Sequence, residues 1–318
     1  MNSQAFVRLR RALTVALILT VLVVVAGATV RATGAGMGCP DWPLCFGCLV
    51  PPVSADQLPP DFAQKYAVDG HPAVFDAVKT WIEYVNRLLG VLAGLGLVVT
   101  TVFTAFVVRR KPSLAVLNGL SLVTLGFVAW LGARVVGTFL APYSVTLHLV
   151  ASFFLVGLLL AQREIVVRAV GTARPAATRF LVGVLVFLGL TFFFQGALGI
   201  RVRDESESWL WNQNLADSLF NAWGGAYDLH KIHAGLVALT ASVLAWLGWR
   251  RRSQDPQLTR LTLAIAGCVA AQALVGLVLW LGGLPAWAKP LHLLAFTGAW
   301  SFWLAAVFHL VPGRAPRV

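Results

Sequence analysis

The sequence has few charged residues. Asp, Glu, Lys and Arg make up only 12% of its 318 residues, whereas 58% are hydrophobic. A soluble domain needs a polar exterior, so this composition excludes an ordinary soluble globular protein. The mean hydropathy of +0.78 instead favours a chain whose surface faces lipid.

The sequence also lacks a small-residue cleavage pattern of the A-x-A kind after its first apolar stretch. We therefore expect this stretch to stay in the protein as a helix rather than be removed as a signal peptide. A transmembrane helix needs about 20 apolar residues, and eight stretches meet this requirement. They cover residues 12–30, 84–108, 115–136, 144–162, 178–200, 228–249, 259–283 and 289–311. The pattern predicts an all-α integral membrane protein of eight transmembrane helices.

The net charge of +12 is distributed in a way that argues against a nucleic-acid partner. With eight spans, every basic cluster falls on one side of the bilayer. These clusters are Arg8, Arg10 and Arg11; Arg109, Arg110 and Lys111; Arg163, Arg168, Arg174 and Arg179; Arg250, Arg251, Arg252 and Arg260; and Arg314 and Arg317. The opposite loops, 31–82 and 201–227, carry most of the acidic residues. Positively charged loops face the cytoplasm, so we expect a multi-pass protein of the cytoplasmic membrane with both termini cytoplasmic.

The two halves of the chain resemble each other. Gly132 precedes His148 by the same spacing that separates Gly276 from His292, and "NRLLG" at 86–90 parallels "HKIHA" at 230–234. This repeat predicts two four-helix bundles related by a pseudo-two-fold axis along the membrane normal. The halves would cover residues 1–165, with a long outer loop, and 175–318. Because bundles hold cofactors between facing helices, we expect one site in each half.

Four of the six histidines lie in or at the edges of predicted spans, near the outer face: His148, His230, His233 and His292. Ionisable groups in a span are costly and usually functional. The simpler interpretation is that each histidine bonds a neighbouring helix or anchors it at the headgroup level. The spans hold few carboxylates and one cysteine, Cys268, so the available ligands are imidazoles. Two imidazoles and Gly-rich helix faces favour haem.

In the second half, His230 and His292 form the expected ligand pair. His233 lies one turn from His230 and is either the alternative ligand or a hydrogen-bond donor beside it. Basic residues at the same level could bind haem propionates, although they could also simply extend to the interface. They are Arg87, Arg134, Lys231 and Lys289.

Several segments, in the same order over almost the whole chain, closely resemble the haem A synthase family. They are "GATVRATGAGMGCPDWPLCFG" at 27–47, "EYVNRLLG" at 83–90, "LGARVV" and "PYSVTLHL" within 131–149, "QGALG" at 195–199, "HKIHA" at 230–234, and "QALVG" and "KPLHLLA" within 272–295. The resemblance implies an eight-helix membrane enzyme that oxidises a methyl group of haem O to the formyl group of haem A. It further implies a haem b in the C-terminal half, substrate haem in the N-terminal half, and haem O synthase and an electron donor as partners.

Carried over by position, His230 and His292 match the haem b ligands, and His148 matches one ligand of the substrate haem. Glu83 matches an acidic residue that the family needs for activity. It would accept a proton or orient the reacting group during two successive oxidations and loss of water. The alternative is an ion pair with Arg87 or Lys79 that only anchors the helix.

Cysteines in the first outer loop also follow the family. The resemblance implies a disulfide between Cys39 and Cys45. Cys48 forms a C-x-x-C pair with Cys45, so the sequence leaves the pairing open. The loop faces the oxidising side, where disulfides persist.

Asn86 departs from the family motif, which reads Glu-x-x-His-Arg. Three interpretations remain open: a deliberately introduced substitution, a natural variant in which His148 alone binds the substrate haem, or loss of chemistry in this half. The last would leave a non-catalytic haem-b-binding electron carrier. A carrier of the cytochrome b type would place its histidine pairs at opposite membrane depths, whereas these histidines all lie near the outer face. A transporter with parallel repeats would need broken helices and mid-membrane charges, which the sequence does not show.

Overall fold

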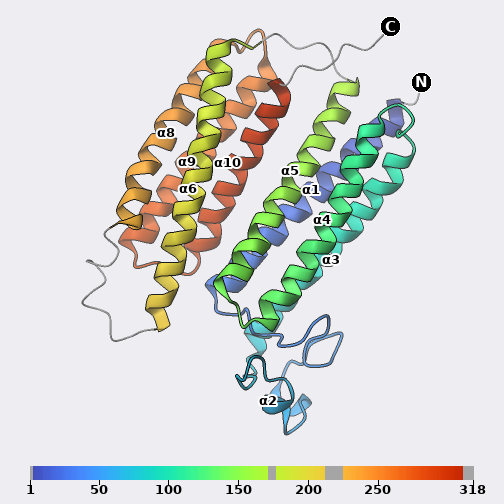
Figure 1. Cartoon of the computed structure of the whole chain (residues 1–318), viewed down its shortest axis with the longest axis vertical. Helices are drawn as coiled ribbons and strands as arrows, with labels where there is room; N and C mark the ends of the chain where they lie inside the picture. The colour runs from blue at the N-terminus through green and yellow to red at the C-terminus, as the bar shows by residue number, and fades with distance from the viewer. Residues whose placement is uncertain (1–2, 171–176, 212–224, 311–318) are drawn as a thin grey trace. The chain divides into compact units, whose positions relative to one another are not determined.

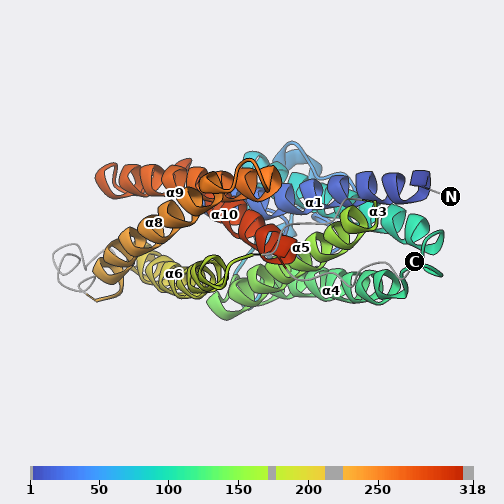
Figure 2. The same ribbon diagram turned by 90° about the horizontal axis from the view of Figure 1, so that it is seen from above.

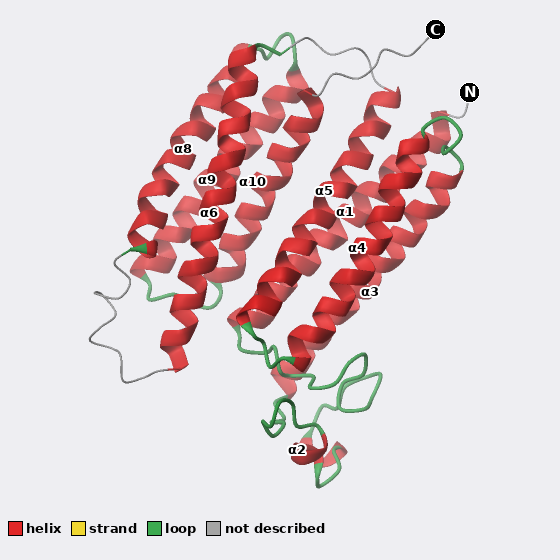
Figure 3. Cartoon of the chain, in the orientation of Figure 1, coloured by secondary structure: helices red, strands yellow, loops and turns green. Residues whose placement is uncertain are grey.

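The structure is a computed structural model that describes residues 3–170, 177–211 and 225–310. Eight of its helices are long and apolar enough to cross a membrane, which confirms the predicted number of spans. They are α1 (Ser3–Ala32), α3 (Ala77–Ala105), α4 (Pro112–Gly137), α5 (Pro142–Val170), α6 (Arg179–Trp211), α8 (Ala226–Arg250), α9 (Pro256–Leu281) and α10 (Ala288–Leu310). The described part of the chain contains no strand (Figure 3), so the all-α fold class is also confirmed.

Some helices continue beyond the apolar stretches from which they were predicted. Helix α1 begins at Ser3 rather than at residue 12, and α6 runs to Trp211 rather than to residue 200. Hydropathy marks the segment that lies in hydrocarbon, whereas helical hydrogen bonding continues into polar residues such as Arg8 and Arg201. The predicted spans were therefore right in number and place but short at these ends.

The chain divides into two compact units. The first unit contains α1, α3, α4 and α5, and also takes in Leu277–Thr297. Helix α1 packs on α3 and α5, and α4 packs on the same two helices, so the four close into a bundle (Figures 1 and 2). Its core is apolar and includes Leu9, Leu13 and Ala16 of α1, Leu97 of α3, and Leu155 and Leu159 of α5.

Polar side chains also join helices inside this unit. Thr100 on α3 donates to Asn118 on α4 over 3.0 Å, and the Asn118 amide donates to Thr101 over 2.8 Å. Gln162 on α5 donates to Ser121 on α4 over 2.9 Å. Such bonds help to associate helices in lipid, where no hydrophobic driving force acts between them.

The second unit contains α6, α8, most of α9 and the part of α10 that follows Thr297. Its core combines Leu188 and Phe192 of α6 with Leu244 of α8 and Ile265 of α9. Trp303 of α10 reaches α6, where its indole N–H donates to the Leu185 carbonyl over 2.8 Å. The predicted halves, 1–165 and 175–318, and the two-fold axis that would relate them stay predictions.

One end of the first unit carries the long loop between α1 and α3; we call this the loop end. The loop contains the short helices η1 (Ala55–Gln57) and α2 (Phe62–Lys65) and a small core of its own (Figure 1). Phe46 lies at the centre of that core and makes edge-to-face ring contacts with Phe62, Tyr66 and Phe75. The loop is therefore a folded substructure that can hold residues in place at the loop end of the bundle.

Candidate functional site

At the loop end of the first unit, two of the predicted site residues have buried polar atoms without partners. Asn86 Oδ1, on α3, and His148 Nδ1, on α5, make no hydrogen bond with any other residue that the structure describes. Burying such an atom unpaired costs about 1–3 kcal/mol. Contact with a ligand is one of the explanations for a group left in this state inside a folded unit.

The surroundings of His148 suit a metal-binding imidazole. Its buried Nδ1 has no hydrogen-bond partner among the described residues. An imidazole nitrogen in this state is available to a metal such as iron. Gly132 lies directly against the ring, because a Cβ at this glycine would stand 3.4 Å from His148 Cε1.

Glu83 lies one turn before Asn86 and is only 4% exposed. One of its carboxylate oxygens accepts from Arg87 over 2.6 Å, and the other accepts from the backbone N–H of Cys39 over 2.9 Å. The predicted catalytic carboxylate is thus engaged by a cation and by the loop.

Arg87 also binds the same loop. Its guanidinium donates to the carbonyls of Cys39, Asp41 and Leu44, each over 2.7 Å. Next to these bonds, Thr80 donates to the Gly38 carbonyl over 2.8 Å. Gly38 approaches α3 so closely that a Cβ would lie 2.6 Å from the Lys79 carbonyl oxygen, which explains the need for glycine there.

The loop held in this way contains the disulfide. Cys39 pairs with Cys45, as the family resemblance implied, and both residues are buried. Cys48 is free and exposed. Its backbone N–H and carbonyl pair with those of Cys45 over 3.1 and 2.9 Å, so the third thiol stands beside the disulfide.

In the second unit, Gln195 of α6 contacts two of the predicted histidines on α8. Its side chain lies 3.2 Å from His230 Nδ1, and its Oε1 lies 2.7 Å from His233 Nδ1. Gly199 stands one turn further along α6, and a Cβ there would be 3.5 Å from His230 Cε1. The His230 ring therefore lies between a glutamine and a glycine of the same helix.

The other predicted residues have varied surroundings. His292 is half-buried near the start of α10, within the segment that clusters with the first unit, and Lys289 is half-buried one turn before it. Arg134 and Lys231 are exposed. Lys231 forms an ion pair with Asp228 over 2.8 Å and lies over the Tyr227 ring. Arg87, predicted as a propionate partner, donates three hydrogen bonds to the loop and one to Glu83.

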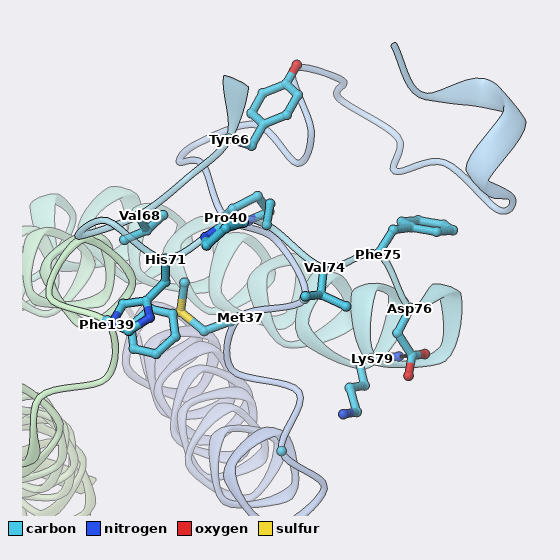
Figure 4. Close-up of a pocket in the computed structure, with 14 residues that line it drawn as sticks. Met37, Pro40, Tyr66, Val68, His71, Val74, Phe75, Asp76, Lys79 and Phe139 are labelled. Carbon is cyan, nitrogen blue, oxygen red and sulfur yellow. Dashed lines mark hydrogen bonds between the residues drawn. The ribbon is translucent and has the colours of Figure 1, made fainter. Parts of the chain in front are cut away.

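A cavity of about 280 Å³ lies between the loop, the start of α3 and Phe139 beyond the end of α4 (Figure 4). His71 stacks on Phe139 at its edge, with the ring centroids 4.2 Å apart, and Met37 and Lys79 line it. Its volume is below the range of about 300–1,000 Å³ typical of small-molecule sites. None of the residues predicted as haem ligands lines it, so we do not assign the haem site there.

Sequence reasoning missed two features. Gln195 was visible only as a letter of the "QGALG" segment. His309, near the end of α10, is 3% exposed and lies 2.9 Å from Asp255, which is also buried. A polar residue at a span end gives no signal of burial until its partner, far away in the sequence, is known.

The described residues contain no cluster of three or more His, Cys, Asp and Glu that could hold a metal ion. Haem needs only one or two protein ligands, because the macrocycle supplies the others. Scattered, half-buried imidazoles against glycines are therefore compatible with haem. Fold and site together define a polytopic, all-helical membrane protein with histidines in its spans.

Comparison with known proteins identifies the family. The COX15-CtaA family model, described as cytochrome oxidase assembly protein, matches residues 10–305. The chain belongs to this family. It is 29% identical to the heme A synthase of Shewanella oneidensis over 291 residues, which cover 83% of this chain and 85% of that protein. It is 28% identical to the heme A synthase of Methylobacterium sp. (strain 4-46), with coverage of 91% and 88%. It is 29% identical to that of Caulobacter sp. (strain K31), with 84% of each chain covered.

Proposed function

We propose that this protein is a haem A synthase, an oxidoreductase that converts a methyl group of haem O into the formyl group of haem A. Relatives of this name match it over most of its length. The structural observation that carries the proposal is the pair of buried, unpartnered atoms in the first unit, Asn86 Oδ1 and His148 Nδ1. The reaction comprises two successive oxidations of one methyl group, followed by loss of water to leave the aldehyde.

Substrate haem would bind in the first unit, with His148 as its axial ligand. The free nitrogen of this imidazole and the glycine against its ring provide a donor and a flat surface, as a macrocycle requires. Asn86 lies on the neighbouring helix α3, and Arg134, exposed near the end of α4, is suited to a propionate at the interface.

Haem b would bind His230 and His292. The Gly199 surface beside His230 supports this assignment, since it admits a flat ring. Gln195 would orient His230. His233 contacts the same amide and would support this arrangement rather than bind the iron. Lys231 would face a propionate. When bound, haem b would relay electrons to or from the substrate haem.

Glu83 would serve the reaction by holding the disulfide loop against α3, one turn from Asn86. Both its oxygens are occupied by protein donors, Arg87 and Cys39. A carboxylate in this arrangement orients groups above the substrate; it accepts a proton only after Arg87 or the loop moves away. We expect Glu83→Ala to retain bound haem b and to stop haem A formation.

The setting of this reaction would be the cytoplasmic membrane, with both termini in the cytoplasm. In the first unit, Arg8, Arg10, Arg11, Arg109, Arg110 and Lys111 all lie at the end opposite to the acidic loop, as the positive-inside rule requires. The disulfide would then face the oxidising side. Haem O synthase would supply the substrate, and a separate protein would donate electrons.

The experiment that tests the proposal is co-expression with a source of haem O, followed by pigment extraction and chromatography. Haem A should appear with the wild-type chain and disappear with His148→Ala. Bound haem b without haem A, under expression conditions that supply haem O, would favour the alternative of a non-catalytic electron carrier. A protein without any haem would refute both.

A further inference from the structure

The two units place different residues at one equivalent position. Asn86 opens the segment "NRLLG" on α3, and His230 opens the parallel segment "HKIHA" on α8. In each unit this residue faces a glycine of the preceding long helix. A Cβ at Gly27 of α1 would lie 4.0 Å from Asn86 Oδ1, and a Cβ at Gly199 of α6 would lie 3.5 Å from His230 Cε1.

This shared position has different chemistry in the two units. An imidazole nitrogen binds haem iron readily, whereas a carboxamide is a poor axial ligand. The Asn86 amide does offer a hydrogen-bond acceptor and two donors. Its Oδ1 is buried and meets no partner among the described residues, although Arg87 beside it makes four hydrogen bonds.

The second candidate ligand in the first unit, His148, differs from Asn86 because it is an imidazole. His148 retains a buried Nδ1 that has no partner among the described residues and is available to a metal. One imidazole and one amide, His148 and Asn86, therefore stand where the parallel positions later in the sequence both carry imidazoles, His292 and His230.

We propose that His148 alone binds the iron of the substrate haem, and that Asn86 covers the opposite face and hydrogen-bonds a small molecule at the open axial position. This inference rests on the proposed function, because it assumes that substrate haem occupies the first unit. With Asn86 in this place, the substrate-haem iron keeps one position open to exogenous ligands. Haem b, bound by two imidazoles, would offer no open position.

Carbon monoxide is a direct probe, because it binds reduced haem only where an axial position is open. The full-length protein, purified from cells that supply haem O, is reduced and titrated with carbon monoxide. We expect one molecule to bind for each pair of haems, and a high-spin component before the addition. In Asn86→His, both haems should be low-spin and binding should be lost.

Asn86→Leu is the matched variant, since it keeps the open position and removes the amide. It should still bind carbon monoxide, and the C–O stretching frequency should rise because the amide NH2 group of Asn86, which can donate to the bound molecule, is lost. An unchanged frequency would overturn the role of Asn86. A wild-type protein that carries two haems and binds no carbon monoxide would overturn the single-imidazole site and leave the proposed function standing. A protein that never takes up a second haem would refute the proposed function itself.

Discussion

Glu83 and Arg87 lie one turn apart on α3 and form an ion pair of 2.6 Å that also binds the loop between α1 and α3. The pair bonds one backbone N–H and three carbonyls of that loop, all between Cys39 and Leu44. A charged pair at the end of a membrane helix is stable when its remaining hydrogen-bonding capacity is satisfied. The loop supplies these partners, so the ion pair and the loop stabilise each other.

Removal of Glu83 should therefore release the loop. Glu83→Ala leaves Arg87 half-buried without its carboxylate, and breaking a buried pair in this way costs about 3–5 kcal/mol. We expect faster cleavage between residues 39 and 75 in limited proteolysis of the detergent-solubilised protein. Glu83→Gln is the control, because its amide oxygen can still accept from Cys39, and it should protect the loop better than alanine. Equal protection in all three proteins would disprove the anchoring role.

Replacement of Cys39 should redirect the disulfide. Cys45 and Cys48 form a backbone-paired couple with two hydrogen bonds. Such couples have a Cα separation of about 5.5 Å, which a disulfide can bridge. In Cys39→Ser we expect a Cys45–Cys48 bond, detected by alkylation and peptide mass spectrometry. Cys39→Ser with Cys48→Ser should leave Cys45 alkylatable. Finding both thiols of the single variant free would contradict this prediction.

His309 and Asp255 should stabilise the end of the second unit at which α9 begins. Asp255 bonds His309 and also accepts from the Leu258 backbone N–H over 3.0 Å, so it both pairs with α10 and caps α9. His309→Ala leaves a buried carboxylate with less compensation, at a cost of about 1–3 kcal/mol or more. Thermal unfolding should begin earlier, with haem content unchanged. Asp255→Asn keeps the cap and should lose less stability.

Gly189 should tolerate no side chain. A Cβ at this position of α6 would lie 2.2 Å from the Trp303 ring, which its bond to Leu185 holds in place. We expect Gly189→Ala to cost about 1–3 kcal/mol through overpacking, measured as a lower unfolding midpoint. Gly183→Ala, on the same helix, is the control, because no described atom beyond that helix turn lies within 4 Å of its Cβ. A similar loss in both variants would point to helix geometry rather than to Trp303.

Sequence patterns predicted the positions of the helices better than the contacts between residues of different segments. Length and apolarity marked all eight spans, because a lipid-facing surface requires them wherever the helix packs. The family resemblance indicated the bond between Cys39 and Cys45, although spacing alone left Cys48 as a rival. What could not be predicted were contacts between residues far apart in sequence. The bonds from Arg87 to the loop carbonyls and from His309 to Asp255 depend on packing that no local pattern encodes.

The amide of Gln195 has a consequence for how this chain can change. One side chain contacts both rings: its Nε2 lies 3.2 and 3.3 Å from the two ring nitrogens of His230, and its Oε1 lies 2.7 Å from His233 Nδ1. A substitution at any of these three positions alters what the other two can donate or accept. We therefore expect substitutions of Gln195, His230 and His233 to be tolerated only when they occur together.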